Sequence, residues 1–197
     1  MIARPPSDAI PLHHVFEISM RLTPATSLVC VVDIQEKLLA AMPAGQQVVS
    51  RSMRLATAAG LLSVPTILTE QYPKGLGRTP PGLSDNLPPA IEKTSFSCCG
   101  CHSFEQAIPA ATAAVILCGL ETHVCITQTA LDLLAAGYGV FIAVDAVSSR
   151  HSLDHDIGLR RLEAAGAILT TTEAILFEWC RSADHAAFQA IRRVVIE

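Results

Sequence analysis

The stretch VILCGLETHVCITQTALDLLAAGYGVFIAVDA, residues 115–146, holds an apolar run, a short polar turn, a helical pattern and a second apolar run. Both apolar runs are rich in Val and Ile and are apolar on both faces, which is typical of strands buried between two layers of helices. The helical pattern stops at Gly137, and glycine is a frequent residue just past the end of a helix. This alternation with short connections predicts parallel strands within one α/β sheet.

The rest of the chain continues the alternation of strand and helix. A third strong strand candidate, SLVCVV, ends at Asp33. Two weaker candidates, residues 64–69 and 166–171, bring the sheet to about five parallel strands. The helical patterns cover residues 46–62, 122–136, 153–165, 173–180 and 184–195. We therefore predict an α/β fold with an open, mainly parallel, doubly wound sheet.

The length of 197 residues and the apolar content of 50% suit one compact domain. We place this domain at residues 25–197 and interpret residues 1–24 as an N-terminal arm that serves oligomer contacts. Residues 70–89 contain five Pro and three Gly, which predicts a long irregular loop. Loops of that length in compact α/β domains usually form the lid or wall of a site.

Charge and cysteine usage narrow the function classes. The net charge of −4 and the absence of Lys or Arg blocks argue against binding to nucleic acid or to an anionic membrane. The most apolar segment, residues 107–120, is shorter than the ~20 residues that cross a bilayer. The seven Cys are an odd number and do not follow a disulfide pattern. We expect a cytoplasmic protein with a small-molecule substrate.

Three residues with useful chemistry follow predicted strands or short apolar stretches: Asp33, Lys93 and Cys125. Ligands of open α/β sheets bind beyond the carboxyl ends of the strands. Thr122 is a candidate N-cap, which would make Cys125 the third residue of a helix. The free backbone N–H groups and the helix dipole there would lower the pKa of the thiol and could hold an oxyanion.

An Asp beside such a thiol could accept its proton, and a nearby Lys would keep the carboxylate ionised. Each residue taken alone also fits a structural role. Cys125 could be a small buried hydrophobic residue, Asp33 could cap a turn and Lys93 could be a solvated surface charge.

Two other clusters contain residue types that can bind metals. The segment SCCGCH, residues 97–102, offers three Cys and one His, but adjacent ligands cannot surround one ion and no second pair stands at a zinc-like spacing. His151 and His155 are four residues apart but lack the HExxH order. We interpret them as a solvated helix start and predict no metal site.

Five stretches provide a more specific signal: DIQEKL, TEQYPKGLG, EKTSFSCC, GLETHVCITQTALDLLAAGYGV and VDAVSSR. Together they resemble the isochorismatase-like cysteine hydrolases, and among these the isochorismatase domain-containing branch. The resemblance implies a three-layer α/β/α fold and a catalytic triad of Asp33, Lys93 and Cys125. It also implies a cis peptide bond between Leu120 and Glu121, and an oxyanion hole formed by the backbone N–H groups of Glu121 and Cys125.

The sequence departs from two branches of this family. Nicotinamidases carry an Asp-x-His metal site after the second strand, where this chain reads LTEQYPKG without Asp or His. We therefore expect no metal and no other cofactor. True isochorismatases have Gly in place of the nucleophilic Cys, so Cys125 argues against isochorismate as the substrate.

The leading hypothesis is a metal-independent cysteine hydrolase that acts on a small amide or a related C–N bond through a thioester on Cys125. The alternatives are a non-catalytic protein that uses the fold for binding or assembly, and a redox-sensing thiol protein based on Cys98, Cys99 and Cys101. We also expect a homo-oligomer, at least a dimer. The residues expected to line the substrate pocket are Gln35, Gln71, Tyr72, Phe96 and Thr122.

Overall fold

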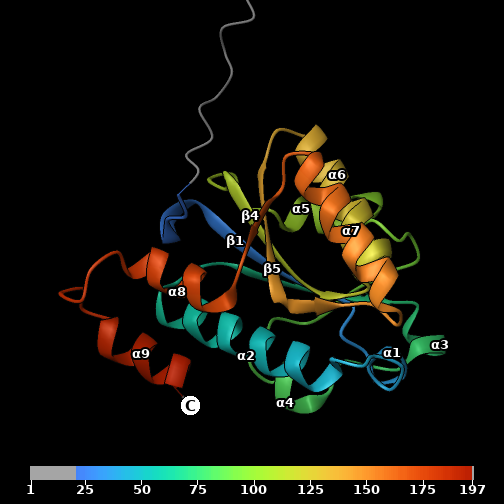
Figure 1. Ribbon diagram of the computed structural model, residues 1–197, viewed down its shortest axis with the longest axis horizontal. Helices are drawn as coiled ribbons and strands as arrows, with labels where there is room; N and C mark the ends of the chain where they lie inside the picture. The colour runs from blue at the N-terminus through green and yellow to red at the C-terminus, as the bar shows by residue number, and fades with distance from the viewer. Residues whose placement is uncertain (1–20, 197) are drawn as a thin grey trace, which may run out of the picture.

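A parallel sheet of six strands forms the centre of the molecule (Figure 1). The computed structural model describes residues 21–196, so residues 1–20 of the proposed arm lie outside the described residues. The strands are β1 (Ser27–Val32), β2 (Thr66–Gln71), β3 (Ile91–Lys93), β4 (Ala114–Leu120), β5 (Gly139–Ser148) and β6 (Ile168–Thr170). Their order is β3-β2-β1-β4-β5-β6. The predicted α/β fold with a doubly wound parallel sheet is confirmed.

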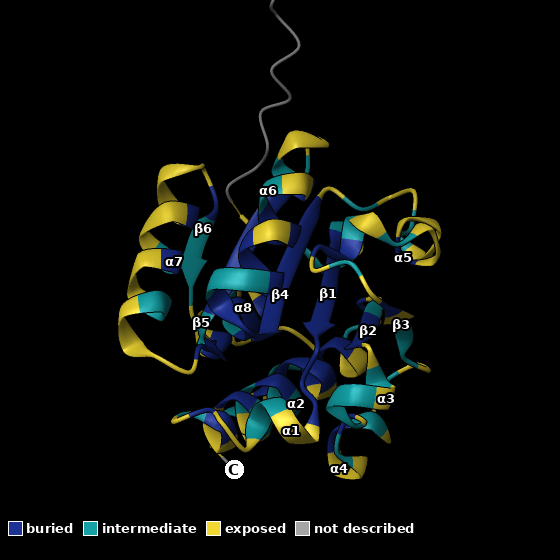
Figure 2. Cartoon of the chain, turned by 90° about the vertical axis from the view of Figure 1, so that its right-hand side faces the viewer, coloured by how far each residue is buried: buried dark blue, intermediate teal, exposed yellow. Residues whose placement is uncertain are grey.

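Helices cover both faces of the sheet and give the molecule three layers (Figure 1). One face is covered by α2 (Gly45–Leu61), α8 (Thr172–Cys180) and α9 (Phe188–Ile196). The other is covered by α5 (His102–Ala107), α6 (Thr127–Ala135) and α7 (Ser152–Ala164). β1 and β4 are buried at every position (Figure 2), which explains why their sequences are apolar on both faces.

The spacing of buried residues in α2 shows which face of this helix packs on the sheet. Val48, Ser52, Leu55 and Ala59 recur every three or four residues, lie on one face and are fully buried. That face packs against β4 and β5. Gly60 lies on the exposed side of the same helix.

Several short elements were not predicted from the sequence. The edge strand β3 has only three residues, too few to give a periodic signal. The prediction that residues 70–89 are irregular is partly wrong, because α3 (Pro73–Leu76) and α4 (Pro81–Ser84) lie there. Each begins with Pro, whose missing N–H is not needed in the first helical turn. α1 (Glu36–Leu39) was also missed, and α9 begins at Phe188 rather than at residue 184.

The sheet reverses its winding direction between β1 and β4, and this is where a doubly wound fold forms its ligand crevice. Val32 at the end of β1 pairs with Gly119 in β4. Gly119 has a φ of +122°, and a Cβ atom there would lie 2.0 Å from the carbonyl oxygen of Val32. Only glycine allows this approach, which brings Asp33 and the segment after β4 to the same edge of the sheet.

The described part of the proposed arm, residues 21–24, lies against the folded domain. Leu22 is fully buried, and its backbone N–H donates to the Glu178 carboxylate at 3.0 Å. Nearby, Trp179 Nε1 donates to Ser27 Oγ at 3.1 Å. Between residues 21 and 196, no helix has the length and apolar character required to cross a membrane.

Candidate active site

Asp33 follows directly on β1 and is fully buried. Its backbone has a φ of +52°, a conformation that Asp tolerates better than most residues. The Asp33 N–H donates to the Thr69 carbonyl at 3.1 Å, and Thr69 Oγ1 donates to Asp33 Oδ1 at 2.7 Å. These bonds to β2 fix the carboxylate and leave Oδ2 for another partner.

That partner is Lys93, the last residue of β3. Its Nζ lies 2.7 Å from Asp33 Oδ2, and both side chains have 0% exposure. Nζ also donates to Gln71 Oε1 at 2.8 Å and to the carbonyl groups of Ser95 at 3.2 Å and Phe96 at 3.1 Å. Burial is the largest single effect and opposes the charged form of Lys93, but Asp33 acts together with Cys125 and Cys98 and raises the pKa of the ammonium group.

Cys125 lies between β4 and α6, in a π-helical turn, η3 (Thr122–Ile126). Such turns are rare and are often found at functional sites. The N-cap residue is Glu121, without a side-chain capping bond, so the predicted role of Thr122 as N-cap is wrong. The predicted low pKa is wrong as well, because burial and the Asp33 carboxylate raise the pKa of the Cys125 thiol, while Lys93 only partly opposes them.

The structure brings Asp33, Lys93 and Cys125 together, although they come from three separate elements. Asp33 and Lys93 both lie close enough to shift the pKa of Cys125, and Cys125 contributes to the raised pKa of Lys93. The resting site therefore contains a neutral thiol beside a buried ion pair. Such an arrangement can move the thiol proton to the carboxylate while the sulfur attacks an electrophile.

The proposed oxyanion hole lies at the junction of β4 and η3. The peptide bond between Leu120 and Glu121 is cis. The Glu121 carbonyl accepts hydrogen bonds from the N–H groups of Val124 at 3.1 Å and Ile126 at 3.2 Å. The Glu121 carboxylate pairs with Arg150 Nε at 3.0 Å, which ties this junction to the segment after β5.

The residues expected to line a substrate pocket have different roles in the structure. Gln35 Nε2 donates to the carbonyl groups of Gln71 at 3.0 Å and Gly77 at 2.7 Å, while Gln35 Oε1 accepts from the Gln71 N–H at 2.8 Å. Gln71 Nε2 donates to the Thr94 carbonyl at 2.7 Å. The amide groups of Gln35 and Gln71 are therefore committed to protein partners.

The remaining candidates differ in exposure. Tyr72 and Phe96 are 55% and 54% exposed, whereas Thr122 is fully buried. Tyr72 lines a cavity of about 440 Å³ together with Lys74, Lys93 and Cys101. Of the five candidates, these two aromatic residues are the most accessible to a ligand.

Residues 27–174 match the family model described as the isochorismatase domain. The chain belongs to the isochorismatase family. It is 39% identical over 177 residues to isochorismatase domain-containing protein 2A of Mus musculus. The aligned residues cover 90% of this chain and 86% of the mouse protein. For isochorismatase domain-containing protein 2 of Bos taurus, the identity is 41% with the same coverage.

Two solved structures extend the comparison for this isochorismatase-family chain. The structure of MAR1 ribonuclease from Caenorhabditis elegans is 41% identical, with a TM-score of 0.86, over 90% of this chain and 93% of that chain. A structure of YcaC from Pseudomonas aeruginosa with hexane-2,5-diol and covalent acrylamide is 27% identical, with a TM-score of 0.81, over 89% and 92%. The resemblance inferred from the sequence is confirmed at the level of family and fold.

Two further side chains, Thr69 and Cys98, lie beside the site of this isochorismatase-family protein; the sequence pointed to Cys98 only as part of a cysteine cluster and did not point to Thr69. Thr69 holds Asp33, and its Oγ1 also lies 3.9 Å from Cys98 Sγ. Cys98 is fully buried, and its N–H donates to Thr129 Oγ1 of α6 at 3.0 Å. Burial raises the pKa of Cys98 to about 11. No sequence signal marks these contacts, because β2 and η2 (Cys98–Gly100) approach β1 only in the folded chain.

The positions considered as metal ligands are separated in the structure. Within residues 21–196, no three side chains of His, Cys, Asp or Glu converge as metal ligands do. Glu70 stands where nicotinamidases carry their metal site, but it accepts hydrogen bonds from Arg78 at 2.8 Å and from the Thr79 N–H at 2.7 Å. Its carboxylate therefore serves the protein scaffold.

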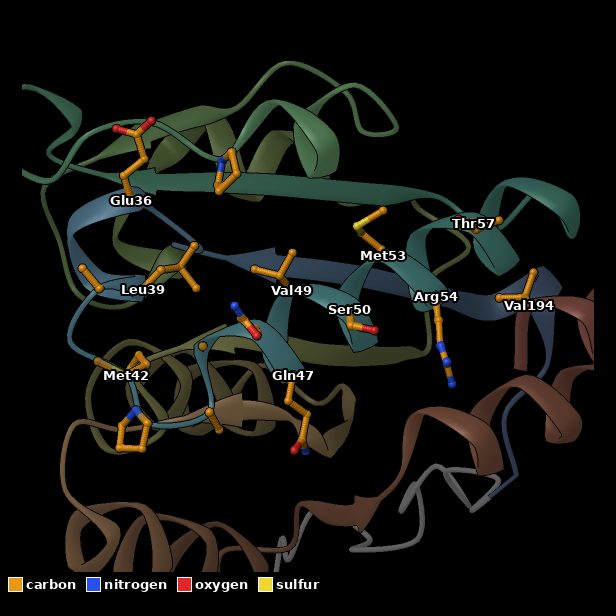
Figure 3. Close-up of a pocket in the computed structure, with 16 residues that line it drawn as sticks. Glu36, Leu39, Met42, Gln47, Val49, Ser50, Met53, Arg54, Thr57 and Val194 are labelled. Atoms are coloured by element: carbon orange, nitrogen blue, oxygen red, sulfur yellow. The ribbon is translucent and has the colours of Figure 1, made fainter. Parts of the chain in front are cut away.

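A groove of about 1190 Å³ runs along α1 and α2, on the side of the sheet that α2, α8 and α9 cover (Figure 3). Its walls include Leu39, Met42, Val49, Met53 and Val194. None of the three candidate catalytic residues lines this groove, so the groove is separate from the candidate active site.

Proposed function

We propose that this protein is a metal-independent cysteine hydrolase that cleaves a small amide or a related C–N bond through a thioester on Cys125. One observation carries the proposal: the Asp33–Lys93 ion pair, with 2.7 Å between Oδ2 and Nζ, is fully buried beside the thiol. Burying two charges is costly unless they are paired. A buried pair that also perturbs a nucleophile is typical of active sites.

In the acylation step, Cys125 Sγ attacks the carbonyl carbon and its proton passes to the Asp33 carboxylate. The π electrons of the carbonyl move to its oxygen, and the backbone N–H groups of Glu121 and Cys125 donate hydrogen bonds to this oxyanion. When the C–N bond breaks, Asp33 returns the proton to the leaving nitrogen. An amine departs and the acyl group stays on Sγ as a thioester.

In the deacylation step, Asp33 accepts a proton from a water molecule whose oxygen attacks the thioester carbon. The C–S bond then breaks, a carboxylic acid departs and Asp33 returns the proton to the sulfur. Lys93 keeps the Asp33 carboxylate in place during both steps. Neither step of the proposed reaction uses a metal ion or another cofactor.

The similar structures support the presence of a nucleophilic side chain, but they do not identify the substrate. The YcaC structure contains covalent acrylamide, an electrophile that captures nucleophilic side chains. The C. elegans relative is described as a ribonuclease, but the net charge of −4 of this chain favours a small substrate, because RNA-binding surfaces are usually rich in Lys and Arg.

The proposal extends to the setting in which the protein works. Seven free thiols suit the reducing cytoplasm. A homo-oligomer without a nucleic-acid or membrane partner is part of the same proposal. The alternatives are a non-catalytic protein that uses the fold for binding or assembly, and a redox-sensing thiol protein based on Cys98, Cys99 and Cys101, of which Cys98 is buried and the other two are partly exposed.

The experiment is a panel of small amides and esters, followed by intact-protein mass spectrometry and peptide mapping. We expect an acyl adduct on Cys125, no adduct in Cys125→Ser, and turnover that survives exhaustive treatment with EDTA. Turnover by Cys125→Ser would exclude the thiol as nucleophile. A loss of turnover in EDTA that is restored by zinc would exclude the metal-independent mechanism.

A further inference from the structure

The first half of α7, from His155 to Gly158, packs against the turn that carries Cys125. Gly158 is buried at this contact, and a Cβ atom there would meet the His123 Cα and Thr122 Cγ2 atoms at 3.3 Å. His123 Nδ1 also lies 2.9 Å from Ser149 Oγ, in the segment between β5 and α7. α7 therefore forms one wall of the turn η3 (Figure 1 shows α7 beside α6).

One hydrogen bond links the interior of η3 to α7. His155 Nδ1 lies 2.9 Å from Thr122 Oγ1. Thr122 is fully buried, and its carbonyl accepts a hydrogen bond from Thr127 Oγ1 at 2.6 Å. A buried hydroxyl that loses its partner is costly, so the bond to His155 restrains the first residue of the turn.

We infer that His155 is a positioning residue for Cys125: through its hydrogen bond to Thr122, it holds the turn so that the thiol stays beside Asp33. The catalytic part of this inference rests on the proposed function, whereas the geometric part concerns only the turn. The sequence pattern predicted a solvated helix start at His151 and His155, but His155 is partly buried. In this inference its side chain supports the turn that carries Cys125.

The groups around His155 favour its neutral form. Burial lowers the pKa of the imidazole, and the neighbouring carboxylate of Asp156 partly opposes this effect. The other charged groups of this region face different partners: Asp154 lies 4.0 Å from His123 Nε2, and Glu121 pairs with Arg150. The bond between His155 and Thr122 therefore joins two uncharged groups at neutral pH, and an uncharged amide can replace the imidazole.

The test compares two substitutions of His155. In His155→Asn the amide group can take the place of Nδ1 and keep the bond to Thr122, whereas His155→Leu removes the bond. Thr122→Val removes the same bond from the other side with little change in volume. His151→Leu alters an exposed residue four positions earlier on the same segment and serves as the matched control.

The first readout is the pH dependence of acrylamide addition to Cys125, followed by peptide mapping, which requires no substrate. In the wild type, labelling should continue to rise above the pH at which a free thiol levels off, because burial raises the pKa of Cys125. A loosened turn lets water reach the sulfur, so the profiles of His155→Leu and Thr122→Val should shift to lower pH. Those of His155→Asn and His151→Leu should match the wild type.

The second readout is turnover. We expect kcat to fall about two- to tenfold in His155→Leu, as for the loss of one hydrogen bond, with little change in KM and with recovery in His155→Asn. The positioning role would be overturned if the labelling profile of His155→Leu overlapped that of the wild type. It would also be overturned if kcat fell as much in His155→Asn as in His155→Leu while the two variants had equal Tm. If Cys125→Ser retains turnover, the proposed function fails, but the labelling profiles still decide the role of His155.

Discussion

At the level of single residues, Cys125 differs from a thiol that is ionised before its substrate arrives. Its pKa is raised because it is buried and lies beside the Asp33 carboxylate. In the proposed mechanism, the thiolate would therefore form only while its proton is being transferred, so the reaction would depend on a base within reach of the sulfur. This fits a carboxylate that lies inside the protein and accepts hydrogen bonds from Thr69 Oγ1 and Lys93 Nζ.

The substitution Asp33→Asn separates the two effects of this carboxylate. Turnover should fall by a factor of about 10²–10⁴, because the amide cannot accept the thiol proton. The pKa of Cys125 should fall at the same time, since the negative charge that raises it is removed while the Lys93 ammonium remains. The kinetics and the pH profile of Cys125 alkylation measure both. An undiminished rate, or a profile shifted to higher pH, would contradict this assignment.

Lys93→Met tests the same ion pair from its other side. Removing the ammonium leaves the Asp33 carboxylate buried without its partner, which should lower the free energy of unfolding by about 3–5 kcal/mol. Adding Asp33→Asn should recover part of this loss in chemical denaturation. The losses in kcat/KM should be strongly non-additive, because the two residues act as one unit. Losses that multiply would show that Lys93 acts independently of Asp33.

The three proposed catalytic residues could be located from the sequence because each stands next to a strand or an apolar segment. Thr69, Cys98 and His155 could not, because their roles depend on contacts between elements that are far apart in the chain. The sequence also predicts a lowered pKa for Cys125, whereas the folded protein raises it, because the burial of the thiol depends on the same distant contacts. The position near a helix start was visible in the sequence, but the degree of burial was not.

Among the elements, β4 and the turn after it depend most on one backbone position. Gly119 has a φ that other residues rarely adopt, and a Cβ atom there would overlap the backbone of Val32. We expect Gly119→Ala to destabilise the protein by about 4 kcal/mol or more, as measured by chemical denaturation.

Gly60→Ala is the control for that substitution. Nothing lies within 4 Å of a Cβ atom at this exposed position in α2, so Ala should stabilise the helix by about 0.5–1 kcal/mol. Equal stabilities of the Gly119→Ala variant and the wild type would contradict the steric argument.

Glu70 connects β2 with the segment before α4. Burial alone would raise the pKa of this carboxyl group, but the Thr79 N–H and Arg78 outweigh it, so the pKa lies below its ordinary value of 4.5. A lowered pKa gives stability that is present above pH 4.5 and is lost as the pH falls through the folded-state value. In Glu70→Gln, the free energy of unfolding should depend less on pH in this acidic range. Parallel pH curves for the two proteins would refute this.

The elements that the sequence predicted well are the long ones. β1, β4 and β5 are buried runs, and α2 and α7 have clear patterns and ends, so local signals agree with the fold. β3 could not be predicted, because one of its three residues is buried and the other two are not. The helix expected at residues 122–136 was correctly located, but its first turn widens into η3, which a regular 3.6-residue period cannot indicate.

For the whole molecule, we predict association between copies of the chain. Leu153 and Ile157 are 68% and 48% exposed and lie four residues apart on α7, so they share one face. Exposed apolar pairs of this kind favour contact with another protein surface. Light scattering at micromolar concentration should give a mass of at least twice the 20.9 kDa of one chain. A mass equal to one chain would refute the prediction.

The buried ion pair of Asp33 and Lys93 makes the candidate active site electroneutral. Each charge balances the other at 2.7 Å, so neither remains to compensate an ion that a ligand would bring in. Moving an unpaired ion out of water into such surroundings is costly. The bond presented to Cys125 should therefore lie at an uncharged end of the substrate, and any ionised group should stay at the far end, in contact with water. A neutral amide should react faster than an analogue with a carboxylate next to the scissile bond.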